Sequence, residues 1–105
     1  QVVVVNSASL LSYVSREDLP PLFEQLRPDA ASDAVRLALL ARHGGVYVDI
    51  GVICHQPLSA WLLPAMADKG VALFYYEAFG RKDRKNDQGE YVENWFIACR
   101  RRHGL

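Results

Sequence analysis

The sequence predicts an α/β fold, in which helices and short strands alternate along the chain. Residues 32–42 carry an apolar stripe and contain no glycine or proline, which favours a helix. Two glycines end that helix, and residues 46–48, a β-branched and aromatic segment, follow as a predicted strand. Residues 2–5 are consecutive valines, typical of a strand covered on both faces of a sheet. Residues 71–76 are predicted as a further strand of that sheet.

Local signals predict the ends of the central helix. Ser32 and Asp33 are N-cap residue types, and the helix dipole favours a carboxylate in the first turn. Arg42 suits the negative end of that dipole, and Gly44 can supply the positive φ with which many helices end. Gly45 then frees the backbone to turn sharply into the strand.

The same stretch of chain carries charged residues with a suggestive spacing. Asp33 and Arg36 are three positions apart, so they share one helical face and can point at the same spot. Asp49 directly follows the strand, at the carboxyl edge where open α/β sheets place their ligands. An acid, a base and a second acid are therefore predicted to converge on one edge of the sheet and to form a binding site.

The remaining predicted elements are short. Residues 15–21 form a polar connector whose prolines forbid a regular helix, and residues 81–89 have the composition of a polar loop. Ser59 is a candidate N-cap. The other expected elements are helical segments at 10–14, 22–26 and 60–67, a strand at 52–54, and a strand or helix at 94–99.

Length and composition narrow the class of protein. A chain of 105 residues holds one domain at most, and 50% hydrophobic with 23% charged residues is ordinary for a globular protein. The formal net charge of zero gives no overall field that favours nucleic acid or an anionic membrane. Two cysteines make no disulfide framework, and no apolar run approaches the roughly 20 residues of a membrane span. A cytoplasmic or membrane-peripheral location is favoured, with the Golgi lumen as the alternative.

Two motifs in the centre of the chain resemble a known family. The motifs are S-D-x-x-R-x-x-x-L, followed by G-G-V-Y-x-D and then P-L. In these motifs the chain resembles the core of the sugar transferases that carry an Asp-x-Asp motif. Members include capsular polysaccharide synthesis proteins, yeast-type initiating mannosyltransferases and the glucosylating domains of large bacterial toxins. The later segment N-W-F-I-A-C-R-R-R-H-G-L is similar to the capsular branch.

The resemblance implies a GT-A fold, a Rossmann-like nucleotide-diphospho-sugar transferase core, of which residues 1–105 would be a single-domain fragment from the donor-binding side of a longer enzyme. It implies a hexosyltransferase that moves a sugar from a nucleotide-sugar donor to a glycan, polysaccharide or lipid-linked acceptor, with retention of anomeric configuration, as in capsule biosynthesis. Mn²⁺ or Mg²⁺ is the cofactor that the resemblance implies.

The resemblance also assigns roles by position. Asp33 matches an aspartate that contacts the donor ribose or sugar, Arg36 an arginine that faces the donor sugar or phosphate, and Tyr47 a residue that lines the donor pocket. Asp49 matches the first carboxylate of Asp-x-Asp and is the expected metal ligand, whereas Gly51 occupies the place of the second. No catalytic residue is assigned. Close backbone approach is expected at three glycines, Gly44, Gly45 and Gly51.

Structural interpretations of the same residues stay open. Asp33 can serve only as a helix-start carboxylate, with Arg36 as its ion-pair partner. Asp49 can be a turn residue before Gly51. Trp95 is favoured as a core residue over an acceptor platform. The combined spacing of the motif residues nevertheless favours a functional site.

Two other functions remain open at this point. A non-catalytic relative could bind a nucleotide sugar or glycan without turnover, which Gly51 motivates. An unrelated α/β interaction module could use Asp33 and Arg36 structurally. A zinc site is not expected, because the adjacent Cys54 and His55 would point to opposite faces of a strand.

Overall fold

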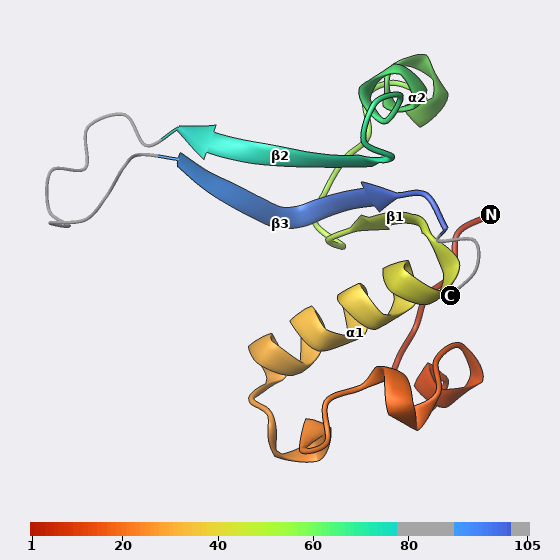
Figure 1. Ribbon diagram of the computed structural model, residues 1–105, viewed down its shortest axis with the longest axis vertical. Coiled ribbons are helices and arrows are strands. Elements are labelled where there is room, and N and C mark those ends of the chain that lie inside the picture. The colour runs from red at the N-terminus through yellow and green to blue at the C-terminus, as the bar shows by residue number, and fades with distance from the viewer. Residues whose placement is uncertain (78–89, 102–105) are drawn as a thin grey trace, which may run out of the picture. The chain divides into compact units, whose positions relative to one another are not determined.

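The computed structural model describes residues 1–77 and 90–101, which divide into two compact units (Figure 1). The first unit comprises residues 1–44 with Arg101, and the second comprises Gly45–Arg100. Helices and strands are both present, so the predicted α/β class is confirmed. The described strands pair antiparallel, so the Rossmann-like core that the resemblance implies is not confirmed by these residues.

The first unit is built around one long helix, α1, which spans Pro28–His43. The predicted start at Ser32 and Asp33 is wrong: Arg27 is the N-cap, and Pro28 occupies the first turn. Proline suits that position because its fixed φ is already helical and its missing N–H has no partner there anyway. Gly44 ends the helix with φ 65°, as predicted.

The chain before α1 forms single 3₁₀ turns in place of the predicted short helices. Leu10–Ser12 and Phe23–Gln25 are three residues each, and a third turn, Arg16–Asp18, lies inside the predicted connector. Pro20 and Pro28 follow the turns Arg16–Asp18 and Phe23–Gln25 and limit their length, since proline lacks the N–H that a further helical bond needs. Buried aliphatic side chains pack the turns onto α1, namely Leu10, Val14, Leu19 and Ala38, with Val5, Phe23, Val35 and Leu39 around them.

The strand predicted at residues 2–5 is wrong. This segment has no regular secondary structure, and Val2 and Val4 are 92% and 80% exposed. A β-branched run favours extended backbone, but a strand also needs a neighbour for its N–H and C=O groups. Among the described residues, the paired strands are Gly45–Val48, Val71–Glu77 and Glu90–Cys99 alone.

A cluster of polar side chains links the connector, residues 15–21, to the end of α1. Both the N–H and the hydroxyl of Ser15 donate to Oδ2 of Asp18, at 2.7 and 3.0 Å. Arg42 Nη1 donates to the same oxygen at 2.6 Å, and His43 Nε2 lies 2.6 Å from the carbonyl oxygen of Tyr13. The last turn of the helix therefore holds the connector at two points.

The second unit contains a three-stranded antiparallel sheet in the order β1-β3-β2. Its strands are β1 (Gly45–Val48), β2 (Val71–Glu77) and β3 (Glu90–Cys99), with β3 in the middle (Figure 1). The predicted strands at 46–48 and 71–76 are confirmed, and residues 94–99 are a strand rather than a helix. The predicted loop at 81–89 lies outside the described residues.

One helical segment lies between β1 and β2. A 3₁₀ turn, Leu58–Ala60, is followed by α2, Leu62–Ala65, which is shorter than predicted and is not capped by Ser59. Pro64 limits α2, because its ring cannot donate a helical hydrogen bond. The strand expected at 52–54 is wrong, since these residues have no regular structure. The core of this unit consists of Leu62, Met66, Phe96 and Ala98, surrounded by Leu58, Trp61, Ala72 and Trp95.

Candidate functional site

Arg36 and Asp33 form an ion pair on α1. Arg36 is only 7% exposed, an unusual burial for an arginine, and its Nη2 lies 3.3 Å from Asp33 Oδ1. The same nitrogen donates to Ser32 Oγ at 3.3 Å, one turn earlier. Buried charges are normally held by a partner, because their desolvation is costly. The helix thus supplies a fixed guanidinium beside a carboxylate, as the spacing predicted.

Tyr47 and Asp49 form a second pair at the end of β1. The Tyr47 hydroxyl donates to Asp49 Oδ1 at 2.7 Å, which is possible because alternate residues of a strand share a face. The Asp49 backbone N–H donates to the carbonyl oxygen of Trp95 in β3 at 2.9 Å. Side chain and backbone are therefore both held, and the carboxylate has a defined orientation.

Directly after Asp49 the chain makes a tight turn. The N–H of Val52 donates to the carbonyl oxygen of Asp49 at 3.0 Å, so Gly51 lies inside the turn. A Cβ atom added at Gly51 would meet no other atom within 4 Å. By contrast, Gly44 and Gly45 have φ of 65° and 100°, values that side-chain-bearing residues rarely adopt. The first two glycines are thus required by backbone conformation, whereas Gly51 is not.

The two pairs belong to different units. Asp33 and Arg36 lie in the unit of residues 1–44, and Tyr47 and Asp49 lie in the unit Gly45–Arg100. Within each unit the predicted partners are brought together. Convergence of both pairs on one donor stays a prediction.

The described residues do not by themselves make a divalent-metal site. Within residues 1–77 and 90–101, no three His, Cys, Asp or Glu side chains lie close enough together to hold an ion. Asp49 is the single motif carboxylate, because Gly51 replaces the second. Cys54 is exposed and directs its thiol to the carbonyl oxygen of Gln56. Participation of Mn²⁺ or Mg²⁺ therefore stays a prediction that rests on the resemblance.

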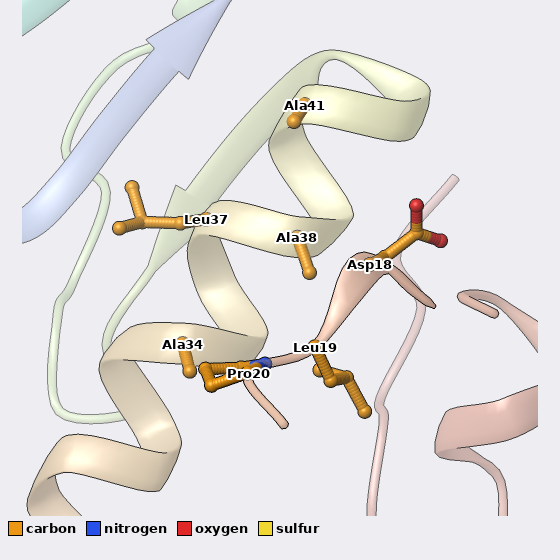
Figure 2. A pocket seen from close by; sticks show the side chains of 7 residues that line it. All are labelled: Asp18, Leu19, Pro20, Ala34, Leu37, Ala38 and Ala41. Atoms are coloured by element: carbon orange, nitrogen blue, oxygen red, sulfur yellow. The ribbon is translucent and has the colours of Figure 1, made fainter. Parts of the chain in front are cut away.

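A shallow hollow on the first unit is lined by none of the predicted site residues (Figure 2). It has a volume of about 410 Å³ and is lined by Asp18, Leu19, Pro20, Ala34, Leu37, Ala38 and Ala41. Figure 2 shows its alanines along one side of α1, opposite Leu19 and Pro20. Asp18 is its single charged residue. An apolar lining with one carboxylate does not suit a nucleoside diphosphate, which carries several negative charges.

Comparison with known proteins identifies the family of the chain. Residues 22–105 match the family described as "Capsular polysaccharide synthesis protein", and this match includes Asp33, Arg36, Tyr47 and Asp49. The chain belongs to this family.

One curated relative of this chain is named as a glycosyltransferase. Glycosyltransferase afumC of Aspergillus fumigatus is 34% identical over 71 residues, which is 68% of this chain and 17% of the relative. The chain therefore spans about a sixth of the length of the relative that it matches. No solved structure matches. Among the described residues, no helix combines the length and apolar character needed to cross a bilayer.

Proposed function

We propose that this chain is the donor-binding part of a GT-A glycosyltransferase that moves a sugar from a nucleotide-sugar donor to a glycan, polysaccharide or lipid-linked acceptor, with retention of configuration. The observation that carries the proposal is the Tyr47–Asp49 pair at the end of β1, in a chain that belongs to the capsular polysaccharide synthesis family. The relative's printed name, glycosyltransferase, supports the class of reaction.

The chemistry of sugar transfer suggests a role for Arg36 and for Asp33. Cleavage of the bond between sugar and diphosphate leaves negative charge on the departing phosphate, and groups fixed in advance stabilise such charge best. Arg36 is a permanent cation with a planar array of donors that suits phosphate oxygens, and its burial limits its motion. Asp33 is proposed to accept hydrogen bonds from hydroxyl groups of the ribose or sugar.

Asp49 is proposed to face the diphosphate end of the donor. Tyr47 fixes one of its oxygens by the 2.7 Å hydrogen bond, which orients the carboxylate before the donor arrives. A divalent ion bound there would supply Lewis-acid stabilisation of the leaving group. Because the described residues offer one motif carboxylate, no step is assigned to such an ion, and its participation is part of the test.

The experiment is donor binding by the full-length protein, measured by calorimetry. UDP- and GDP-sugars are titrated with and without Mn²⁺ into the wild type, Asp49→Ala and Asp33→Ala. Asp29→Ala is the matched control, because Asp29 also lies on α1 and pairs with an arginine, Arg27, yet both side chains are exposed. Loss of a charged hydrogen-bond partner is worth about 1.5–3 kcal/mol. We therefore expect affinity to fall roughly 10- to 100-fold in the two test variants and to stay unchanged in the control.

Gly51→Asp tests the metal. The position has space for a side chain and no positive φ, so the substitution is sterically admissible, and Gly51→Ala controls for the added Cβ. If an ion binds at Asp49, the second carboxylate should strengthen Mn²⁺-dependent donor binding. A donor that binds equally well without Mn²⁺ in the wild type and in Gly51→Asp would favour a metal-independent site. Absence of binding by every nucleotide sugar tested would contradict the proposed function.

A second candidate function has one observation in its favour. Gly51 removes a carboxylate that the motif normally supplies, which would suit a relative that binds a nucleotide sugar without transfer. Donor binding without hydrolysis or transfer in the presence of glycan acceptors would distinguish this candidate from the enzyme.

A further inference from the structure

Four aromatic rings gather in the second unit, around the pairing of β2 and β3. Phe96 is 3% exposed, and its ring centroid lies 5.4 Å from Trp61 and 5.3 Å from Phe74. Trp95 stacks on Phe74, with 4.9 Å between centroids and 12° between ring planes. Trp95 also meets Phe96 edge to face at 6.1 Å. These contacts hold the indole in one orientation, because stacked and edge-on geometries are the preferred ones for aromatic pairs.

An irregularity of the sheet accounts for the position of the indole. Neighbouring residues of a strand normally face opposite sides, yet the rings of Trp95 and Phe96 both contact Phe74. The register between β2 and β3 shifts between Leu73 and Phe74, and bulges of this kind redirect side chains. Unlike Phe96, Trp95 is only half-buried. Phe74 therefore braces one face of the indole, and Trp95 as a residue stays partly exposed.

Trp95 is also the neighbour of Asp49 across the sheet. The Asp49 N–H donates to the Trp95 carbonyl oxygen at 2.9 Å, one position beyond the Val48–Phe96 pair. Residues opposed in antiparallel strands have Cα atoms about 4.5–5.5 Å apart. The indole and the carboxylate therefore extend from backbone positions that lie side by side.

We infer that Trp95 is the stacking platform for the sugar ring of the nucleotide-sugar donor, next to the diphosphate at Asp49. This inference rests on the proposed function. A sugar ring presents a face of C–H groups with partial positive charge, and the face of an indole is electron-rich. The contact needs no ordering of Trp95 on binding, because Phe74 and Phe96 already fix the ring, and such preorganisation favours affinity.

The sugar is favoured over the nucleobase as the occupant. A base can stack on an indole as well. In the proposed arrangement, however, Asp49 faces the diphosphate, and the sugar to be transferred is bonded directly to that diphosphate. The base is separated from it by the ribose. Comparing a nucleotide sugar with its nucleoside diphosphate distinguishes the two occupants.

The test uses the full-length protein and calorimetric titration of UDP, UDP-glucose, UDP-galactose, GDP and GDP-mannose. Trp95→Leu removes the ring, and Trp61→Leu is the matched control, because Trp61 contacts Phe74 and Phe96 in the same cluster. Trp95→Leu should weaken binding of the nucleotide sugar about 10-fold, or about 1.4 kcal/mol, and that of the matching nucleoside diphosphate less than about 2-fold. Trp61→Leu should change neither affinity by more than about 2-fold. Thermal denaturation of each variant confirms that titrations are made on folded protein.

A conservative variant keeps the test decisive. Trp95→Phe retains a smaller aromatic ring and should weaken nucleotide-sugar binding selectively by only about 3-fold. Three results overturn the inference and leave the proposed function standing: no loss in the Trp95 variants, an equal loss for nucleotide sugar and nucleoside diphosphate, or the same selective loss in Trp61→Leu. Failure of the wild type to bind any of the nucleotide sugars overturns the proposed function and this inference together.

Discussion

The two units hold their candidate site residues in different ways. In the unit of residues 1–44, Asp33 and Arg36 are positioned by one helix, through contacts that span three and four residues. In the unit Gly45–Arg100, Asp49 is positioned by its neighbour Tyr47 and by the backbone of Trp95, which lies far along the chain. The position of the site residues in the first unit is therefore set by contacts within one helix, whereas the position of Asp49 depends on correct strand pairing.

The hydrophobic cores of the two units also differ in composition. The first unit packs aliphatic side chains of 3₁₀ turns against a helix, and its polar cluster adds fixed points at the end of α1. The second unit depends on Phe96 and Ala98 of the central strand, both of which are buried, and on the aromatic rings around them. A packing defect in β3 should therefore disturb the site at Asp49 more than a defect of equal size in the first unit should disturb Arg36.

The largest effect is expected from Phe96→Ala. Phe96 is 3% exposed and contacts three other aromatic rings, so its removal leaves a cavity in the centre of the second unit. Replacing a buried phenylalanine by alanine typically lowers the free energy of unfolding by about 3–5 kcal/mol. Chemical denaturation of the full-length protein measures the loss. The control is Leu63→Ala, at 68% exposure, which should stay within about 0.5 kcal/mol of the wild type. Equal losses would mean that β3 is not the core of this unit.

Gly44→Ala should have the next largest effect, because Gly44 joins α1 to β1. Its φ of 65° and ψ of −161° belong to a region that is essentially restricted to glycine. Forcing alanine into such a region costs about 1–3 kcal/mol. Gly51→Ala is the matched control, since a Cβ there meets nothing within 4 Å and the backbone needs no positive φ. Denaturation midpoints that fall equally in both variants would contradict a conformational role of Gly44.

Local signals predicted much of the fold. The glycine stop at Gly44, the strand after it and the strand at 71–76 follow from residue types within a few positions. Predictions failed where a partner decides the outcome. The valines at 2–5 favour extended backbone but have no strand beside them, and Pro28 began α1 a full turn before the residues chosen as caps. Pairing of the strands as an antiparallel sheet could not be read from short apolar runs, because such runs carry no direction.

In the candidate site, too, local contacts were predictable from the sequence and contacts between strands were not. The Asp33–Arg36 pair was predictable, since residues three apart on a helix are neighbours. The hydrogen bond between Tyr47 and Asp49 could have been predicted from strand alternation, which places both on one face. The backbone bond from Asp49 to Trp95 could not, because it requires the register of β1 against β3. Trp95, which the sequence favours as a core residue, does pack against the core of the second unit, but it is only half-buried, and its backbone neighbours that of Asp49.

The smallest effect, and the sharpest check on the first unit, concerns the acid titration of Asp18. The backbone N–H of Ser15, with smaller contributions from the Ser15 hydroxyl and Arg42, lowers the pKa of Asp18 below its usual 3.8. A carboxyl group whose folded-state pKa is depressed stabilises the fold above its unfolded-state pKa, and that contribution is lost as the pH falls through the folded-state pKa. Asp18→Asn should therefore melt at a lower temperature than the wild type at pH 5–7, and the difference should shrink below about pH 4.

Arg42→Gln separates the contributions to this titration. It removes the guanidinium that lies 2.6 Å from Asp18 Oδ2 but keeps both hydrogen bonds from Ser15. Because the Ser15 N–H is the largest cause of the lowered pKa, Arg42→Gln should retain most of the pH dependence that Asp18→Asn abolishes. Thermal melts of the three proteins between pH 2 and 7 decide the point. A gap between wild type and Asp18→Asn that stays constant over this range would show that Asp18 acts through packing alone, and the end of α1 would then be held by His43 and apolar contacts rather than by charge.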